Sequence, residues 1–356
     1  MSIERGHAHG IPDVQTTFNG RLGYACLNTV LRNKKPASEA VFCSRTCRIN
    51  SIKKNGIDWV KNLGRKNAQD LMEIIEWNER NVGLTAILYA KSHTLPAEHP
   101  FYENVRGFHF TRAELTCPLR SSDMFPFASH ETYGYSLTYC APLLAQVGDL
   151  AKKYGHRLTV HPGQFTQLGS LREGVVRSSI RELEYHCEML DLMGIGPDGV
   201  MVIHGGGVYG DKKATLERIR KTIRDDLPKN VRNRLVLEND EVSYTAADLL
   251  PLCADLDVPL VFDYHHDTLN PSRGLTPAEI TEQANAIFRR RGIKPKQHYS
   301  EPREGAISIM ERRAHSNRCQ SLPAGLPDDM DLMIEAKDKE QAVLQLYRIY
   351  NLHRDP

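Results

Sequence analysis

The sequence predicts a single α/β domain folded as a (β/α)8 TIM barrel, and two observations support this prediction. Short apolar runs alternate with longer segments of helical spacing along the 356-residue chain, which is typical of parallel strands joined by crossover helices. Eight such runs occur, the number that closes a barrel. An open doubly wound sheet is the alternative, but no G-x-G-x-x-G motif follows the first run.

The predicted elements follow one another in regular order. The strands are expected at residues 22–27, 85–90, 157–160, 200–203, 234–237, 259–262, 294–299 and 331–334. The helices are expected at residues 58–77, 139–155, 178–194, 215–227, 246–256, 277–292 and 339–350. Residues 91–116 follow neither period, so we expect an insertion there, in or just after the second strand.

Composition and charge exclude several classes of protein. The chain has 46 Lys and Arg against 44 Asp and Glu, which excludes a polybasic coat but leaves room for a local basic groove. No apolar run approaches the roughly 18 residues that cross a bilayer. The first residues contain no apolar signal segment. We therefore expect a protein that is not secreted, whose eight cysteines are reduced thiols.

Histidines and carboxylates follow the predicted strands, where each strand ends. Chance would scatter such residues over helices and loops, whereas barrel enzymes place their chemistry at the carboxyl ends of strands. One more histidine, His266, lies three residues after the sixth strand end. The strand-end residues, in chain order, are His161, His204, Glu238, Asp263, His298 and Glu335.

A mixed cluster of this size is best explained by bound cations. Carboxylates alone would repel one another and become neutral, while imidazole and carboxylate together suit divalent metals. About three such ions suit phosphodiester hydrolysis. A sugar isomerase on the same fold would use carboxylate-dominated sites and a lysine, so the histidines favour a nuclease. Glycines beside two of the histidines, at 163 and 205–207, would let the backbone approach a ligand closely.

Ten short motifs support a more specific hypothesis. They are RLGYACLN (21–28), VFCSRTCR (41–48), RSSDMFPFASH (120–130), TVHPGQF (159–165), VIHGGG (202–207), LENDE (237–241), FDYHHD (262–267), KPKQHYSEP (294–302), RRAHS (312–316) and DLMIEAKDKEQA (331–342). With these motifs the chain resembles the ultraviolet damage endonuclease family, barrels related to endonuclease IV and the xylose isomerase-like proteins. The last three motifs are most similar to the fungal branch. The resemblance covers residues 21–352 as one endonuclease domain, after an N-terminal tail at 1–20.

The resemblance implies a site for three divalent metal ions. Manganese is the expected ion, with zinc and magnesium as alternatives. Glu238 would bridge two of the metals. The implied ligands are His161, His204 and Glu238 for the first metal; Glu238, Asp263, His298 and Glu335 for the second; and His266 and His315 for the third.

The resemblance also implies a catalytic lysine and a set of DNA-contacting residues. Lys296 matches a lysine that members can carry in carboxylated, metal-facing form, and it is predicted to act with Glu238. Gln164 and Phe165 match a pair that is wedged into the duplex at the lesion, where the Phe165 ring can stack on a base. The other residues predicted to contact the lesion or DNA are Tyr24, Asn28 and His130.

A basic segment after the first strand is a candidate for gripping the DNA backbone. Its cations could neutralise phosphates, although a solvated charged loop explains the same cluster equally well. The residues are Lys34, Lys35, Arg45, Arg48, Lys53 and Lys54.

The predicted function is that of a DNA repair endonuclease that nicks the strand immediately 5′ to ultraviolet photoproducts, both cyclobutane dimers and 6-4 photoproducts. An abasic-site endonuclease of the endonuclease IV type, a metal-dependent sugar isomerase and a lesion-binding protein with structural metals are the alternatives. The expected partner is double-stranded DNA carrying ultraviolet lesions, with no membrane, nucleotide cofactor or obligate protein partner. The expected location is the nucleus, and also the mitochondrion, in a eukaryote, or otherwise the cytoplasm.

Overall fold

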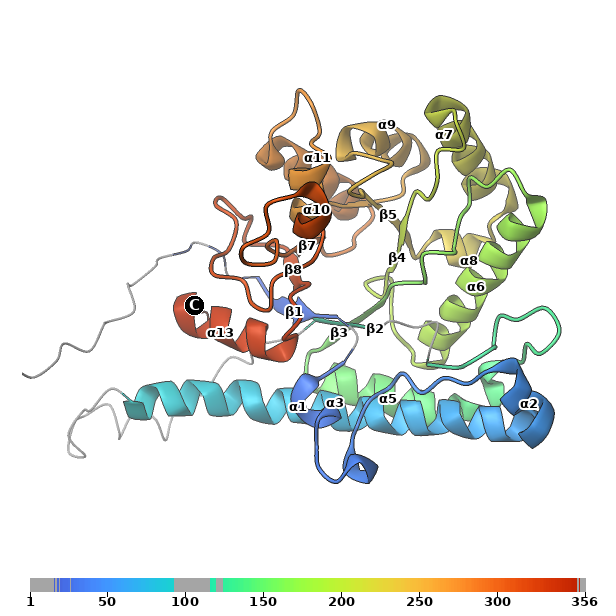
Figure 1. Cartoon of the computed structure of the whole chain (residues 1–356), viewed down its shortest axis with the longest axis vertical. Coiled ribbons are helices and arrows are strands. Elements are labelled where there is room, and N and C mark those ends of the chain that lie inside the picture. The colour runs from blue at the N-terminus through green and yellow to red at the C-terminus, as the bar shows by residue number, and fades with distance from the viewer. Residues whose placement is uncertain are drawn as a thin grey trace, which may run out of the picture.

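Eight parallel strands form one closed sheet, as the (β/α)8 prediction requires (Figure 1). The computed structural model describes residues 16, 18, 20–25, 27–92, 116–119, 124–350 and 352. Along the sheet the strands are ordered β6-β5-β4-β3-β2-β1-β8-β7. A parallel bridge between Asp263 and His298 joins the two ends of this order and closes the ring. The predicted barrel fold is therefore confirmed.

The strands are short, between two and four residues each. Their bounds are β1 Leu22–Tyr24, β2 Thr116–Leu119, β3 Arg157–Val160, β4 Met201–His204, β5 Leu235–Glu238, β6 Leu260–Val261, β7 Lys296–Tyr299 and β8 Asp331–Ile334.

The helices begin where side chains can cap them. Thr245 and Thr276 each form a complete capping box at the start of α9 and α11, which satisfies backbone N–H groups that the first helical turn leaves free. A π-helical turn over Thr222–Asp226 follows α7. The helix bounds are α1 Thr29–Arg32, α2 Ile49–Asn55, α3 Ile57–Ser92, α5 Ala141–Lys153, α6 Glu173–Leu192, α7 Lys212–Lys221, α8 Lys229–Arg232, α9 Ala246–Leu256, α10 Tyr264–Leu269, α11 Pro277–Arg290, α12 Ile309–Arg312 and α13 Glu340–Tyr350.

The predicted second strand at residues 85–90 is wrong. These residues form the last turns of α3, which runs for 36 residues, and the second strand is β2 at Thr116–Leu119. A short apolar run does not distinguish a strand from a helix by its period, and no proline interrupts the helical pattern before residue 92. The predicted insertion at 91–116 starts inside α3 and ends on the first residue of β2, while residues 93–115 lie outside the described residues.

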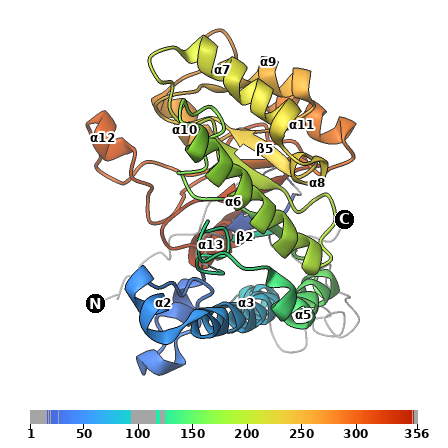
Figure 2. The same cartoon turned by 90° about the vertical axis from the view of Figure 1, so that its right-hand side faces the viewer.

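Helices α3 and α5 lie side by side along one flank of the barrel (Figures 1 and 2). Helices α7, α9 and α11 lie on the opposite side of the ring, and α6 runs between them and α5 (Figure 2). Apolar residues of the strands pack outward against the surrounding helices; Leu332 and Ile334 of β8, for example, share a buried apolar cluster with residues of α13. Among the described residues no helix is both long and apolar enough to cross a membrane.

Charged and polar side chains enter the barrel from β3, β7 and β8, because strand residues alternate between its two faces. In β7, Gln297 points outward and donates to Asn285 of α11, so Lys296 and His298 on either side point inward. In β3 and β8 the same alternation directs Arg157 and Asp331 inward at the amino end of the barrel.

Arg157 and Asp331 form an ionic cluster with two residues that precede strands, Arg21 before β1 and Lys294 before β7. We call these four residues the floor cluster. Asp331 is fully buried. Its carboxylate accepts hydrogen bonds from Arg21 at 2.6 and 2.7 Å and from Arg157 at 2.8 Å, and it lies 3.3 Å from the Lys294 amine. Three cations therefore surround one buried carboxylate at the end of the barrel opposite the histidines.

Candidate metal centre

Seven of the eight predicted metal ligands converge at the carboxyl end of the barrel. They form three groups in which one potential ligand atom per residue lies within 4.8 Å of the others. Because Glu238 and Asp263 each belong to two groups, the three groups make one continuous cluster. The groups are His161, His204 and Glu238; Glu238, Asp263 and His266; and Asp263, His298 and Glu335.

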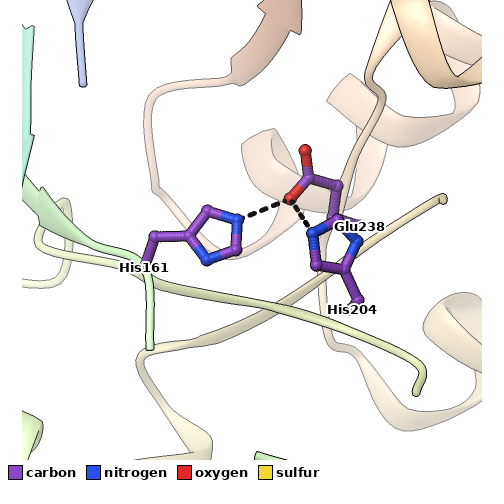
Figure 3. A group of neighbouring side chains, drawn as sticks. All are labelled: His161, His204 and Glu238. Atoms are coloured by element: carbon purple, nitrogen blue, oxygen red, sulfur yellow. Dashed lines mark hydrogen bonds and ion pairs between the residues drawn. The ribbon is translucent and has the colours of Figure 1, made fainter. Parts of the chain in front are cut away.

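Glu238 lies at the centre of this cluster and is 1% exposed. Its Oε2 lies 2.9 Å from Nε2 of His161 and 3.6 Å from Nε2 of His204, as Figure 3 shows. Its Oε1 lies 2.7 Å from Nδ1 of His298. One carboxylate therefore faces histidines from three different strands, the geometry expected of a bridging ligand.

The carboxylates of the cluster are held as anions. Burial alone would raise the pKa of Glu238, but the imidazoles of His298 and His204 hold it well below its ordinary value. Burial likewise opposes ionisation of Glu335, yet His298 lowers the pKa of Glu335 to about 2. Both side chains are therefore ionised at neutral pH, the state that binds a cation.

The imidazoles respond to the same surroundings in opposite ways. Burial would lower the pKa of His266, but the carboxylates of Asp263 and Glu238 raise it to about 9. Burial dominates at His204 and lowers its pKa. In the metal-free cluster His266 thus carries a proton at neutral pH, while His204 is held in its neutral form.

Asn239, which the sequence analysis did not identify, fixes two of the predicted ligands. Its side chain accepts from the backbone N–H of Asp263 at 2.8 Å and donates to the Asp263 carbonyl at 3.0 Å. Its own carbonyl lies 2.9 Å from Nδ1 of His266. This contact directs Nε2 of His266 toward the cluster. The sequence feature that could have identified Asn239 is its position directly after Glu238 of β5, inside the LENDE motif.

The cluster fits divalent metal ions by a test independent of its resemblance to known sites. Two of its buried polar atoms, Oδ2 of Asp263 and Nδ1 of His204, have no hydrogen-bond partner in the described part of the chain. Buried polar groups are almost always paired, because an unpaired one costs free energy. A cation would supply the missing partner of Asp263, and the mixed imidazole and carboxylate donors suit manganese or zinc.

His315 lies beside the cluster but belongs to none of the three groups found among the described residues. Its Nδ1 lies 2.6 Å from the hydroxyl of Ser300, and its ring centroid is 5.1 Å from that of His265. His265 is 1% exposed, and neither of its ring nitrogens has a hydrogen-bond partner among the described side chains. The predicted pairing of His266 with His315 as ligands therefore remains a prediction.

Lys296 is fully buried beneath the cluster. Its Nζ lies 2.5 Å from Nε2 of His298. Burial, reinforced by the charge of Arg157, lowers the pKa of Lys296 to about 7. Near neutral pH a large fraction of this amine is therefore uncharged and nucleophilic.

The predicted wedge residues stand on the loop that follows β3. Gln164 is exposed, and Phe165 is 81% exposed, three and four residues after His161. Two hydrogen bonds hold the loop: the Tyr209 hydroxyl donates to the Gln167 side chain, and the Gln167 side chain donates to the Gln164 carbonyl at 3.4 Å. A large aromatic ring is thus presented to solvent beside the metal centre.

The remaining predicted DNA contacts have structural partners. Tyr24 is fully buried, with its hydroxyl 2.6 Å from Oδ1 of Asn78. Asn28 is also buried and caps α1 by accepting from the N–H of Leu31. Nδ1 of His130 accepts from the N–H of Thr132 at 3.0 Å. The structure does not expose Tyr24 or Asn28 to a ligand, so their contact with a lesion remains a prediction.

Two further expectations are modified by packing. In the basic segment Arg45 is tied to the buried carboxylate of Asp70, so it supports the fold, whereas the other five cations are exposed. At Gly205 an added Cβ would lie 2.6 Å from the ring of Tyr244. Close packing, rather than ligand approach, therefore accounts for the absence of a side chain at Gly205.

Comparison with known proteins gives one family. The sequence model of the UV-endonuclease UvdE family matches residues 20–96 and 109–354. The unmatched residues, 97–108, lie inside the predicted insertion at 91–116 and are shorter than it. The crystal structure of SacUVDE is similar to the chain, with a TM-score of 0.72 and 26% identity, over 93% of this chain and 97% of that one.

Two fungal proteins are similar to the chain over almost its whole length. Identity is 46% with the UV-damage endonuclease of Schizosaccharomyces pombe, covering 97% of this chain and 53% of the relative. It is 42% with that of Neurospora crassa, covering 99% and 55%. The predicted similarity to the fungal branch is confirmed, and the chain spans about half the length of these two relatives.

Proposed function

Because the chain belongs to the UV-endonuclease UvdE family, we propose that it is a DNA repair endonuclease that nicks the backbone immediately 5′ to ultraviolet photoproducts. The substrate is double-stranded DNA carrying a cyclobutane dimer or a 6-4 photoproduct, and the products carry a 3′-hydroxyl and a 5′-phosphate. The relatives named UV-damage endonuclease support this substrate class.

The observation that carries the proposal is the shared cluster at the carboxyl end of the barrel. Three groups of ligand atoms are linked through Glu238 and Asp263, so ions bound there would lie close enough to act on one phosphate. An unpartnered carboxylate oxygen on Asp263 supports the binding of a cation. Such ions would lower the pKa of a bound water and offset charge on the phosphate oxygens.

We assign three ions to the site, with manganese as the preferred metal because imidazole ligands suit softer ions than magnesium. The first and second sites use the ligands implied by the family, with Glu238 as the bridge. The third site is built around His266 and His315.

Glu238 and Lys296 have distinct proposed roles. Glu238 supplies an anion that three histidines keep ionised, and it orients those imidazoles toward the ions. Lys296, with its pKa near 7, supplies an uncharged amine that can add carbon dioxide, releasing one proton and forming a carbamate. A carboxylated Lys296 would place a further anion beside His298.

Lesion recognition is assigned to the loop after β3. The exposed ring of Phe165 can stack on a base that a photoproduct has partly unstacked, with Gln164 beside it. The exposed cations of the basic segment, such as Lys34 and Lys53, would contact phosphates of the flanking duplex.

The test is a nicking assay on three matched duplexes: one with a single thymine dimer, one with a single abasic site and one undamaged. The expected result is one nick, 5′ to the dimer, with manganese present, less with magnesium and none with a chelator. Preferred cleavage at the abasic site would favour an endonuclease IV-type activity. Binding to the dimer duplex without a nick would favour a lesion-binding protein.

A further inference from the structure

An exposed apolar tip stands on the connection between β7 and β8. Ile307 is 89% exposed, Ile309 67% and Met310 70%. Ile307 is the most exposed large apolar side chain among the described residues. Single exposed apolar residues are common on protein surfaces, but a contiguous group marks an interaction site.

The tip is held in a defined conformation. Ser308 and Glu311 form a complete capping box around α12. Below the helix the two arms of the connection pair with each other: the N–H of Arg303 donates to the Ala314 carbonyl at 2.7 Å, and Pro302 bridges to His315. We call this segment, residues 300–318, the β7–β8 arm. Its helix α12 stands clear of the barrel, at the same edge of the molecule as α2 (Figure 2).

The base of the β7–β8 arm is anchored at the metal centre. His315, a predicted ligand, sits in the arm, and its ring centroid lies 5.1 Å from that of His265, the neighbour of His266. The guanidinium of Arg313 donates to Glu241 at 3.0 Å, and Glu241 in turn lies 3.9 Å from Nε2 of His266. The tip therefore projects from the rim of the cluster and not from a distant part of the fold.

We propose that the apolar tip is a second DNA-contacting element, which inserts into a groove of the duplex beside the lesion. This inference rests on the proposed function. Isoleucine and methionine are among the side chains that other proteins use as wedges between base steps, where they kink the duplex. A phosphate held at the metal centre would bring the flanking duplex to the base of the arm.

Charge supports a nucleic acid as the occupant. Between residues 303 and 313 the arm carries Arg303, Arg312 and Arg313 against two glutamates, a net charge of one. Arg303 lies 3.9 Å from Glu311 and Arg313 donates to Glu241, so Arg312 is the arginine left to contact a phosphate. One of these glutamates, Glu311, caps α12. The arginines flank an apolar centre, the arrangement in which cations contact phosphates while the apolar side chains enter the groove. Phe165 on the β3 loop would then contact the lesion itself, and the tip would contact the duplex next to the lesion.

The test compares two triple variants at the same positions. In the first, Ile307, Ile309 and Met310 are replaced by serine; in the matched control, all three are replaced by leucine. For a thymine-dimer duplex we expect the dissociation constant to rise about 10-fold with serine, which corresponds to about 1.4 kcal/mol. It should change less than about twofold with leucine. Manganese content should stay at the wild-type level in both, because no metal ligand is altered.

Several outcomes would overturn the inference. An unchanged dissociation constant in the serine variant would do so, and so would equal losses in the serine and leucine variants. If the serine variant changed a wild-type dimer into a monomer while DNA binding stayed the same, the tip would be a self-association surface. A wild-type protein that nicked no damaged duplex would instead contradict the proposed function, so the two failures are distinguishable.

Discussion

The two ends of the barrel interior each hold a buried charged cluster, built partly from the same strands. Strand β3 carries Arg157 at the floor, and His161 follows it at the metal centre. Strand β8 carries Asp331 at the floor, and Glu335 follows it at the metal centre. Within each strand the two residues are four positions apart, which is about 13 Å of extended chain.

The two clusters differ in the charge of the groups that are left without a partner. At the floor, one carboxylate is surrounded by three cations and both oxygens of Asp331 are engaged, and the buried atom there without a hydrogen-bond partner in the described part of the chain is a cationic donor, Nη2 of Arg157. At the metal centre there are too few hydrogen-bond donors for the carboxylate oxygens, and Oδ2 of Asp263 is left without a partner among the described residues. A buried charged cluster therefore does not by itself indicate a metal site. A buried carboxylate oxygen without a partner does.

The largest effect should come from Glu238→Gln, which removes the anion shared by three histidines. Nicking of a thymine-dimer duplex should fall to less than a few per cent of the wild-type rate, about 2–3 kcal/mol of transition-state stabilisation or more, while circular dichroism shows a folded barrel. The matched control is Glu217→Gln, an exposed glutamate on α7, which should nick at the wild-type rate. Substantial activity in Glu238→Gln would show that Glu238 is not the bridging ligand of the metal centre.

At the floor, Asp331→Asn should reduce stability and leave metal binding intact. The change leaves the buried Arg157 with only the exposed carboxylate of Asp198, 4.0 Å away, as a counter-charge, and loss of a buried partner typically costs about 3–5 kcal/mol. Urea unfolding measures the loss. A folded variant with wild-type stability would show that the floor cluster is not a paired structural element.

The wedge residues should affect selectivity without affecting metal content. In a Gln164→Ala, Phe165→Ala double variant, discrimination between damaged and undamaged duplex should fall roughly 5- to 100-fold, since stacking is worth about 1–3 kcal/mol per base. Leu171→Ala, at a position where leucine is 65% exposed, is the control and should keep full selectivity. If the double variant discriminates like the wild type, the lesion is read elsewhere.

The floor also predicts how stability depends on acid. Although burial opposes it, the contacts with Arg21 and Arg157 lower the pKa of Asp331 from 3.8 to about 2. A depressed carboxylate stabilises the fold above its unfolded pKa, and this stability is lost as the pH falls through the folded value. We expect about 2 kcal/mol to be lost between pH 4 and pH 2. In Asp331→Asn this part of the pH dependence should be absent from denaturation curves.

The smallest predicted effect is proton release at the metal centre. His266 has a pKa of about 9 in the metal-free cluster and must lose its proton to bind a metal. Manganese binding at pH 7.5 should therefore release about one proton per chain from this residue. Calorimetry in two buffers with different ionisation enthalpies measures it, and a buffer-independent enthalpy would show that His266 is not a ligand.

Much of the site could be predicted because parallel strands bring their carboxyl ends together. A residue such as His204 could be identified from its position after an apolar run alone. The floor cluster could not, because Arg157 and Asp331 begin their strands, where a charged residue is indistinguishable from the end of a loop. Asn239 was missed for a similar reason: its role depends on the backbone of Asp263, which no local pattern reveals.

The fold was predicted correctly except at the second strand. The run at 85–90 has the composition of a strand, but it continues a helix that begins at Ile57. The correct strand, β2, contains a cysteine and a proline and has little apolar character of its own. Its place in the ring depends on pairing with β3 along four residues, a long-range contact that local periodicity does not contain.

The metal centre can be tested by titrating the metal-free protein with manganese and measuring the ions bound per chain. The wild type and Asp331→Asn should each bind more than one ion, because Asp331 lies at the opposite end of the barrel and belongs to none of the three ligand groups. Asp263→Asn, which removes the negative charge of the carboxylate whose Oδ2 has no partner among the described residues, should lose at least one of these ions while remaining folded. A wild type that binds no manganese would contradict the assignment of the metal centre. So would a folded Asp331→Asn variant that loses as many ions as Asp263→Asn.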